Sequence, residues 1–284
     1  MTAICLCSIQ DLAAQTIKQQ LLKLFPFKKT GQTFDSYPIY QLDNLSVVTI
    51  ESDSIYADHL DQRLAADLFI FASRHKSAAF KPALLAHSPG NWAAADLGGK
   101  PATLCVAHPA ALKAALQTLL TERPRVGLQD WACGLEATHH GPWIENTPVL
   151  FVEIGSSETE WQNEAAATAV ARAIVAAAEN RQRVAPTVLG FGGPHYCPTF
   201  TRIEAETELA VSHIMPKYHL DQASEAIIRQ AIARTVGRVS SAVLDWKGMT
   251  GAQRERLCAL LGSMDVAVLR DHDALHGRQD ERQG

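Results

Sequence analysis

Seven consecutive residues, Glu136 to Pro142, combine groups that bind metals or move protons. The stretch Glu-Ala-Thr-His-His-Gly-Pro holds a carboxylate and two adjacent imidazoles, which are ligand types for zinc and similar metals. On a helix, Glu136 and His140 would share a face. On a strand they would again share a face, and His139 would point to the other side. A polar turn with satisfied histidines is the alternative, and this stretch alone does not decide between the two.

Other candidate residues fall at or just beyond the predicted C-terminal ends of strands. In an open α/β sheet those ends line one crevice, where ligands bind. Five histidines and two carboxylates converging there would suit a hydrolytic site with one or two metal ions. In such a site the metal lowers the pKa of bound water to about 7, and a free carboxylate moves the proton. The candidates are His87, Glu136, His139, His140, Glu153, His195 and His213.

Each candidate also has a structural interpretation. His87 could simply cap a loop, and His195 and His213 lie next to proline-containing turns. Glu153 lies on an otherwise apolar strand, and an isolated buried carboxylate is costly, so it must be paired or ligated. The remaining histidines are expected to be surface, core or tail residues: His59, His75, His108, His219, His272 and His276.

The elements that would position these residues alternate between strands and helices. This pattern predicts an α/β class with a mixed, largely parallel sheet. We expect one catalytic domain, residues 1–270, and a polar, disordered tail, residues 271–284. Apolar runs predict strands over residues 3–9, 67–73, 83–86, 148–154, 187–190, 242–245 and 266–269, with a hairpin over 38–51. Helices are predicted over residues 12–24, 56–66, 109–120, 158–180, 221–235 and 250–261.

Composition limits the class of protein. A length of 284 residues, with 47% hydrophobic and 20% charged residues, is ordinary for a soluble globular protein. A net charge of −4 does not suit a protein that coats DNA, although it allows a local basic patch. Six scattered cysteines without a C-x-x-C pair indicate reduced thiols.

Cellular location and cofactor class follow from what the sequence lacks. Neither a signal peptide nor a membrane-spanning run is evident, so we expect a cytoplasmic protein. The glycine-rich segments match no nucleotide-binding motif, so a nucleotide cofactor is not predicted. Lys217 beside Tyr218 and Lys247 beside Trp246 could contact a phosphate, with a solvated lysine as the alternative.

Several motifs, taken in order, resemble those of the archaeal and plant type of D-aminoacyl-tRNA deacylase. The two most specific are Glu136-Ala-Thr-His-His-Gly-Pro142 and Phe151-Val-Glu-Ile-Gly-Ser-Ser157. The resemblance runs from near the N-terminus to about residue 270. The other motifs are Phe71-Ala-Ser-Arg-His75, Gly90-Asn-Trp92, His195-Tyr196, His213-Ile-Met-Pro-Lys-Tyr218 and Asp245-Trp-Lys-Gly248.

The resemblance implies a zinc-dependent hydrolase that cleaves the ester between a D-amino acid and tRNA. It also implies a monomer with a three-layer α/β/α fold, similar to that of peptidyl-tRNA hydrolase and the nucleoside phosphorylases. One or two zinc ions would be held by some of His87, Glu136, His140, His195 and His213. Glu136, Glu153 and His139 would act in catalysis, and which glutamate is ligand and which is base stays open. The residues expected to contact substrate are Asn91, Trp92, Gly155, Ser156, Tyr196 and Lys217, the last at a terminal phosphate.

Two residues depart from the family pattern. Pro194 precedes His195 where the family usually has a third glycine, and Ser212 precedes His213 where it usually has glycine. Proline fixes φ and serine adds bulk, so loop shape and substrate tolerance at these points stay open. Two alternative functions also stay open. One is another enzyme of the same fold, a peptidyl-tRNA hydrolase or metallo-amidase, and the other is a non-catalytic, metal-stabilised RNA-binding module.

Overall fold

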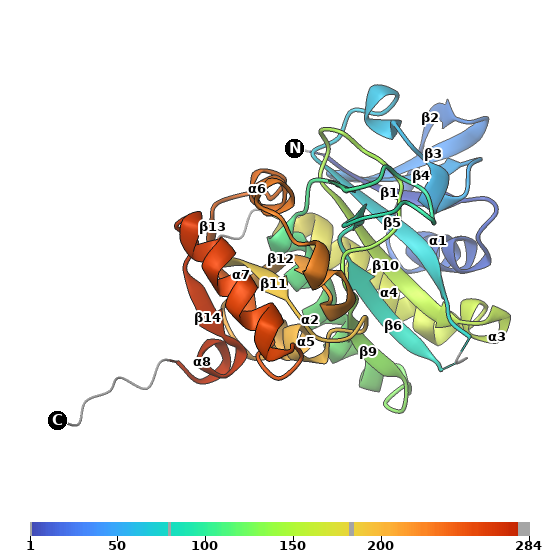
Figure 1. Ribbon diagram of the computed structural model, residues 1–284. Coiled ribbons are helices and arrows are strands. Elements are labelled where there is room, and N and C mark those ends of the chain that lie inside the picture. The colour runs from blue at the N-terminus through green and yellow to red at the C-terminus, as the bar shows by residue number, and fades with distance from the viewer. Residues whose placement is uncertain (1, 79–80, 182–184, 278–284) are drawn as a thin grey trace.

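Two open β-sheets form the framework of the protein (Figure 1). The computed structural model describes residues 2–78, 81–181 and 185–277. The larger sheet has eight strands in the order β2-β3-β4-β1-β5-β10-β6-β9 and is mixed, with a parallel centre. Its strands are β1 (Ala3–Ser8), β2 (Lys28–Phe34), β3 (Tyr37–Leu42), β4 (Leu45–Ile50), β5 (Leu68–Lys76), β6 (Ala83–His87), β9 (Ala132–Leu135) and β10 (Val149–Ser156).

The smaller sheet has four parallel strands in the order β12-β11-β13-β14. They are β11 (Thr187–Phe191), β12 (Ala210–Met215), β13 (Val239–Leu244) and β14 (Val268–Arg270). Two short antiparallel strands, β7 (Gly90–Asn91) and β8 (Thr103–Leu104), form a separate pair.

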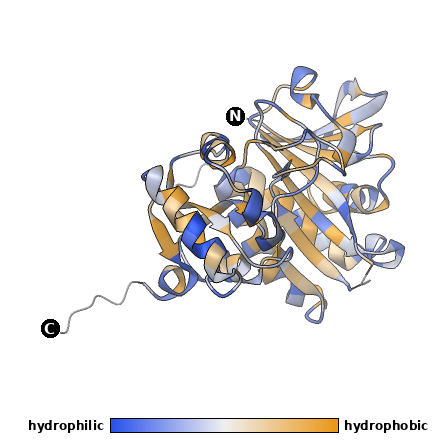
Figure 2. Ribbon diagram, in the orientation of Figure 1, coloured by the Kyte–Doolittle hydropathy of each residue, from blue (hydrophilic) through white to orange (hydrophobic). Residues whose placement is uncertain are grey.

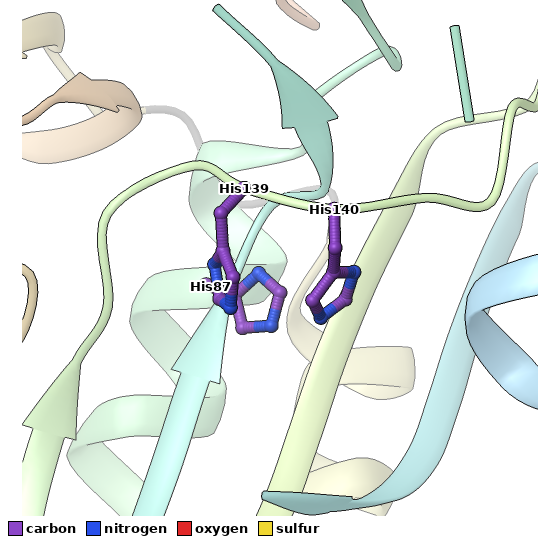
Figure 3. Close-up of side chains that lie close together, drawn as sticks. All are labelled: His87, His139 and His140. Atoms are coloured by element: carbon purple, nitrogen blue, oxygen red, sulfur yellow. The ribbon is translucent and has the colours of Figure 1, made fainter. Parts of the chain in front are cut away.

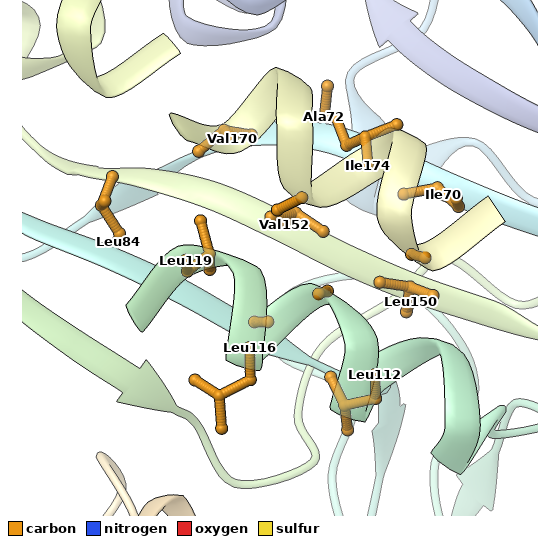
Figure 4. Close-up of a cluster of buried hydrophobic side chains, with 14 of the residues drawn as sticks. Ile70, Ala72, Leu84, Leu112, Leu116, Leu119, Leu150, Val152, Val170 and Ile174 are labelled. Carbon is orange, nitrogen blue, oxygen red and sulfur yellow. The ribbon is translucent and has the colours of Figure 1, made fainter. Parts of the chain in front are cut away.

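Helices pack against both sheets. Helices α1, α2 and α4 cover one face of the larger sheet, where they meet alternate residues of β5 and β10 such as Ile70, Leu150 and Val152 (Figure 4). Apolar residues are concentrated in the strands (Figure 2), as expected where a sheet is covered by helices. The helices are α1 (Leu12–Leu24), α2 (Pro109–Arg125), α3 (Glu158–Trp161), α4 (Glu164–Asn180), α5 (Pro198–Glu206), α6 (Glu225–Ala233), α7 (Gly251–Ser263) and α8 (Asp271–His276). The described residues also form three 3₁₀ turns, η1 (Ser54–Tyr56), η2 (Leu60–Gln62) and η3 (Lys217–Gln222).

The other face of the larger sheet changes from apolar to polar along its strands. Phe71 and Phe151 stack there with ring centroids 4.6 Å apart. Because side chains alternate along a strand, the residues two and four positions further along β5 and β10 lie on the same face. On β10 the first of these is Glu153, and on β5 the second is His75. The strand register therefore brings Glu153 and His75 to the same face of the sheet, beyond the stacked rings of Phe71 and Phe151.

The predicted α/β class with a mixed, largely parallel sheet is confirmed, although the strands divide between two sheets. Residues 56–66 do not form the predicted helix. Asp58 and Asp61 instead accept the backbone amides of Trp143 and Asn146, which holds this segment as two short turns. The predicted helix over 158–180 is two helices, because Asn163 caps the start of α4.

Strand β2 and helix α5 were not predicted. Of the expected tail, residues 271–276 form α8, and residues 278–284 lie outside the described residues. The single-domain organisation of residues 1–270 remains a prediction. Among the residues that the structure describes, no helix is long and apolar enough to cross a membrane.

Candidate metal and catalytic site

The loop that follows β9, residues 136–141, lies between the two sheets and is hydrogen-bonded to the smaller one. The amide of Ala137 donates to the carbonyl of His195 at 2.8 Å. The amide of Thr138 donates to the carbonyl of Ile214 at 3.0 Å. These bonds fix the loop, and with it the side chains that the sequence motif carries.

Three imidazoles meet beside this loop, two of them from the loop itself. His87 comes from the end of β6, and one ring nitrogen from each of His87, His139 and His140 lies within 4.8 Å of the others (Figure 3). The ring centroids are 4.3 Å apart for His87 and His139 and 4.7 Å apart for His87 and His140. His140 adopts a left-handed conformation, with φ at 48°. Non-glycine residues in that region are uncommon and cluster at functional sites.

Hydrogen bonds fix the tautomers of two of these rings. Nδ1 of His139 donates to the carbonyl of Ala137 at 2.8 Å, and Nδ1 of His140 donates to the carbonyl of Gly141. In the neutral ring this leaves Nε2 with a free lone pair, which is how metal-ligating histidines are usually oriented. In the described part of the chain, neither ring nitrogen of His87 has a hydrogen-bond partner, although the ring is wholly buried.

Glu136 occupies the centre of a second group. Its Oε1 accepts from Nε2 of His195 at 2.9 Å and lies 3.3 Å from Nδ1 of His75. Glu136, His139 and His195 form one further set of possible ligands, and Glu136, His75 and Glu153 form another. The three sets overlap, so one continuous cluster of imidazoles and carboxylates crosses the site.

Two tyrosines connect this cluster to the surface. The hydroxyl of Tyr196 lies 3.2 Å from Nε2 of His75, and that of Tyr218 lies 3.2 Å from Nδ1 of His195. Tyr196 is 46% exposed and Tyr218 is 53% exposed. Each histidine beside Glu136 therefore has its outer nitrogen next to a phenol at the surface.

A cavity of about 390 Å³ opens over the cluster. His75, His139, His195 and Glu153 line it, whereas Glu136 is buried and does not. The residues that line it are Asp53, Ile55, Ser73, Arg74, His75, Lys76, Leu97, His139, His140, Glu153 and His195.

Burial keeps two of the imidazoles neutral. Burial and the neighbouring His140 hold the pKa of His139 well below its usual range. Burial also lowers the pKa of His140 to about 3. For His87, burial opposes the charged form, but the carboxylate of Glu153, 3.8 Å away, outweighs it and raises the pKa. A distance of 3.8 Å is beyond hydrogen-bonding range, so the effect of Glu153 on His87 is mainly that of its charge.

The pKa values of the two glutamates are shifted in opposite directions. Burial opposes ionisation of Glu136, but His195 and His75 outweigh it and hold its pKa well below the usual range. Burial raises the pKa of Glu153. Two carboxylates whose environments separate their pKa values are typical of sites in which one stays ionised and the other exchanges a proton.

This donor set fits a zinc ion. Structural and catalytic zinc sites use imidazole and carboxylate ligands, and three histidines with one open position form a known catalytic arrangement. Fixed tautomers, neutral rings and the unpartnered nitrogens of His87 all meet the needs of such a site.

His213 does not join the cluster, although the sequence analysis placed it among the ligands. It is wholly buried on β12, where its Nε2 donates to the carbonyl of Arg234 at 3.0 Å. Burial lowers its pKa to about 4, so it stays neutral. None of the possible ligand sets found among the described residues includes it. The neighbouring Ser212 is also buried and bonds Thr235 at 2.6 Å, whereas Pro194 is exposed in the loop before His195.

Asn91 and Trp92 use their side-chain donors to hold loops. Asn91 donates to the carbonyls of Gly98 and Lys100, which fixes the loop that brings Leu97 to the cavity. Nε1 of Trp92 donates to the carbonyl of Ile214 at 3.0 Å. Both residues therefore position the walls of the site rather than present these groups to a ligand.

The other predicted substrate contacts do not line this cavity. Ser156 donates to the carbonyl of Lys81 at 2.6 Å, and a Cβ at Gly155 would lie 2.8 Å from Cδ2 of His75. Gly155 is thus the residue that leaves room for the His75 ring. Lys217 follows β12 with an exposed side chain, and its amide donates to the carbonyl of Gly193.

His75 was expected to be a surface or core histidine, and the structure instead places it beside both glutamates. The predicted strand ended at Ser73, whereas β5 continues to Lys76. The Phe-Ala-Ser-Arg-His motif could have indicated this position. If the strand continues to its end, His75 lies on the same face as Phe71 and Ser73.

Comparisons with known proteins identify the family. Residues 62–269 match the family model described as D-aminoacyl-tRNA deacylase. The D-aminoacyl-tRNA deacylase of Thermococcus onnurineus is 38% identical over 268 residues, covering 92% of this chain and 97% of that protein. The one from Methanosarcina acetivorans is 36% identical, covering 97% of this chain and 95% of that protein. The crystal structure of a conserved protein of unknown function has a TM-score of 0.88 at 29% identity and covers 96% of each chain. This chain belongs to the D-aminoacyl-tRNA deacylase family.

Proposed function

We propose that this protein hydrolyses the ester between a D-amino acid and the 3′ end of tRNA, and so proofreads translation, at the cavity above the larger sheet. The supporting observation is the convergence of His75, His139, His195 and Glu153 on that one cavity. Family membership supplies the substrate class.

Zinc is the proposed cofactor. The residues that would hold it are His87, His139 and His140, because their ring nitrogens are close together and carry free lone pairs. Glu136 and His195 would hold a second ion, or else support the first. When bound, zinc supplies a Lewis acid and a water of lowered pKa.

Glu153 is proposed as the residue that moves the proton, and Glu136 as the residue that orients the imidazoles. The reason is geometric, since Glu153 lines the cavity, whereas Glu136 is buried with two histidines on one oxygen. The directions of the two pKa values agree with these roles.

The RNA end would enter between the exposed tyrosines. Unpaired bases stack on aromatic rings, and Tyr196 and Tyr218 present exposed rings next to His75 and His195, which line the cavity. Lys217, next to Tyr218, is the proposed phosphate contact, and the amides at Gly155 and Ser156 are the proposed oxyanion donors. The expected cytoplasmic location and monomeric state follow from the resemblance alone.

The test is hydrolysis of D-tyrosyl-tRNA and L-tyrosyl-tRNA, with and without a chelator. We expect turnover of the D ester only, loss of turnover with the chelator and recovery on addition of zinc. Glu153→Gln should lower kcat by roughly 10²–10⁴-fold, as loss of a general base does. Glu158→Gln, at an exposed position of α3, is the matched control and should keep the wild-type rate.

The alternative functions give different results. Equal hydrolysis of the D and L esters would favour another hydrolase of this fold. Binding of tRNA without any turnover would favour an RNA-binding module. Full activity of zinc-free protein would contradict the metal-assisted mechanism.

A further inference from the structure

A second cavity adjoins the candidate site. It measures about 260 Å³ and is lined mainly by apolar atoms of the larger sheet. His75 lines both cavities and so forms their common wall. We call this second cavity the side recess and define it by Ala83, Leu85, Ala132, His75 and Tyr196.

The register of two strands builds the floor of the side recess. Ala83 of β6 is paired with Ala132 of β9. Because side chains alternate, Ala83 and Leu85 lie on the same face of β6 as His87, and Ala132 lies on the same face of β9 as Gly134. Ala83 and Ala132 are neighbours on adjacent strands, and their small side chains leave a space that larger side chains would fill. The volume of the side recess therefore results from the alanines at the start of β6 and β9.

The wall between the cavities is fixed in place. His75 is held on one side by Glu136 and on the other by the hydroxyl of Tyr196. Its ring lies over Gly155, where a Cβ would approach to 2.8 Å. A group bound beside His75 in the site thus has the side recess directly next to it.

Two hydroxyl groups of the side recess are already engaged in hydrogen bonds. The hydroxyl of Ser156 donates to the carbonyl of Lys81, and that of Tyr196 donates to Ser77 Oγ at 3.3 Å. The lining is mainly apolar, and Lys81 brings the one positive charge among the residues that line the side recess, so a cationic side chain would be disfavoured there. An apolar cavity of roughly 150 Å³ holds benzene, so the side recess has room for a phenol ring.

We propose that the side recess binds the side chain of the aminoacyl group, and that it favours aromatic and large aliphatic side chains over small or cationic ones. This inference rests on the proposed function, because it places the ester beside His75 and Glu153. The side chain leaves the carbon atom next to the ester, so only a neighbouring space can hold it.

The test compares kcat/KM for D-tyrosyl-tRNA and D-alanyl-tRNA. We expect the wild-type protein to prefer the tyrosyl ester. Ala132→Leu would fill the side recess from an exposed position and should lower the ratio of the two kcat/KM values by at least about tenfold, mainly through KM for the tyrosyl ester. Ala83→Val reduces the same volume by a smaller change and serves if Ala132→Leu does not fold. Gln129→Leu adds an apolar side chain on the loop before β9, outside the side recess, and should keep the wild-type ratio.

The outcomes distinguish a failure of the proposed function from a failure of the side recess assignment. A wild-type protein that hydrolyses neither ester would overturn both the proposed function and the side recess assignment. Hydrolysis of both esters, with an unchanged ratio in folded Ala132→Leu and Ala83→Val, would overturn the side recess assignment alone. A ratio that falls in these variants and not in Gln129→Leu would support it.

Discussion

Replacing Lys113 by methionine should strongly destabilise the protein without touching the site. Lys113 lies on α2 and is buried, and its Nζ donates to the carbonyls of Glu204, Thr207 and Leu209 at 2.7, 2.9 and 2.7 Å. It also lies 3.3 Å from Oε2 of Glu204, which is wholly buried. One ammonium group therefore joins α2 to the end of α5 and to the start of β12.

The expected magnitude follows from what methionine leaves behind. It fills the volume of the lysine stem, so no large cavity forms, but three carbonyls and a carboxyl lose their donor. Removing one partner of a buried ion pair costs about 3–5 kcal/mol. For a chain of this size that corresponds to a decrease in Tm of roughly 6–10 °C.

Glu204 adds a pH dependence of known sign. Burial raises the pKa of Glu204 to about 7, although Lys113 acts in the opposite direction. The folded state then holds a proton that the unfolded state has already lost, so stability is greatest below the ordinary carboxyl pKa and decreases as pH rises through about 7. Lys113→Met should move this decrease to higher pH, and Glu204→Gln should remove it.

Urea and thermal unfolding at about pH 5 and about pH 8 measure both effects. Arg202→Met removes an exposed ion pair with Glu206 on the same helix and should leave the unfolding free energy nearly unchanged. A loss below about 1 kcal/mol in Lys113→Met would refute the reasoning. So would a Glu204→Gln variant with the pH dependence of the wild type.

Two further predictions concern the site. Gly155→Ala should lower kcat at least about tenfold with little loss of stability, because its Cβ would displace the His75 ring. Steady-state deacylation measures kcat, and a melting curve measures stability. A folded Gly155→Ala variant with the wild-type kcat would contradict this prediction. Gly262→Ala is the control, because a Cβ there meets nothing within 4 Å. His87→Phe should keep the stacking on Phe151 but weaken zinc binding at least about a hundredfold, since it removes a ligand from the three-histidine set. Calorimetric zinc titration measures this, with His219→Phe at the exposed η3 turn as control, and equal affinity in the variant would contradict the assignment.

The sequence predicted the α/β class and the motif whose histidines lie close together, while the roles of the site residues stay a prediction. Glu136, His139 and His140 lie within five positions of the sequence, so they must lie close together in any fold. Strand ends were harder to place, because β5 continues past Arg74 into residues that look polar. That extension turned His75 from a loop residue into the wall of the cavity.

His213 was misplaced for a related reason. Position at the end of a strand brings a residue near a site, but the alternation of side chains decides which way it points. Along β12 the backbone of Ile214 bonds Thr138 of the site loop, whereas the ring of His213 bonds Arg234. Division of the strands between two sheets was also hidden, since a hydrophobic run shows that a strand is buried but not which strand it pairs with.

The bond between Glu136 and His195 crosses from one sheet to the other. His75, His87 and Glu153 belong to the larger sheet, while His195 follows β11 of the smaller one. The proposed site therefore depends on contacts between the two sheets, and mild heating or a chaotrope that separates them should abolish hydrolysis before either sheet unfolds.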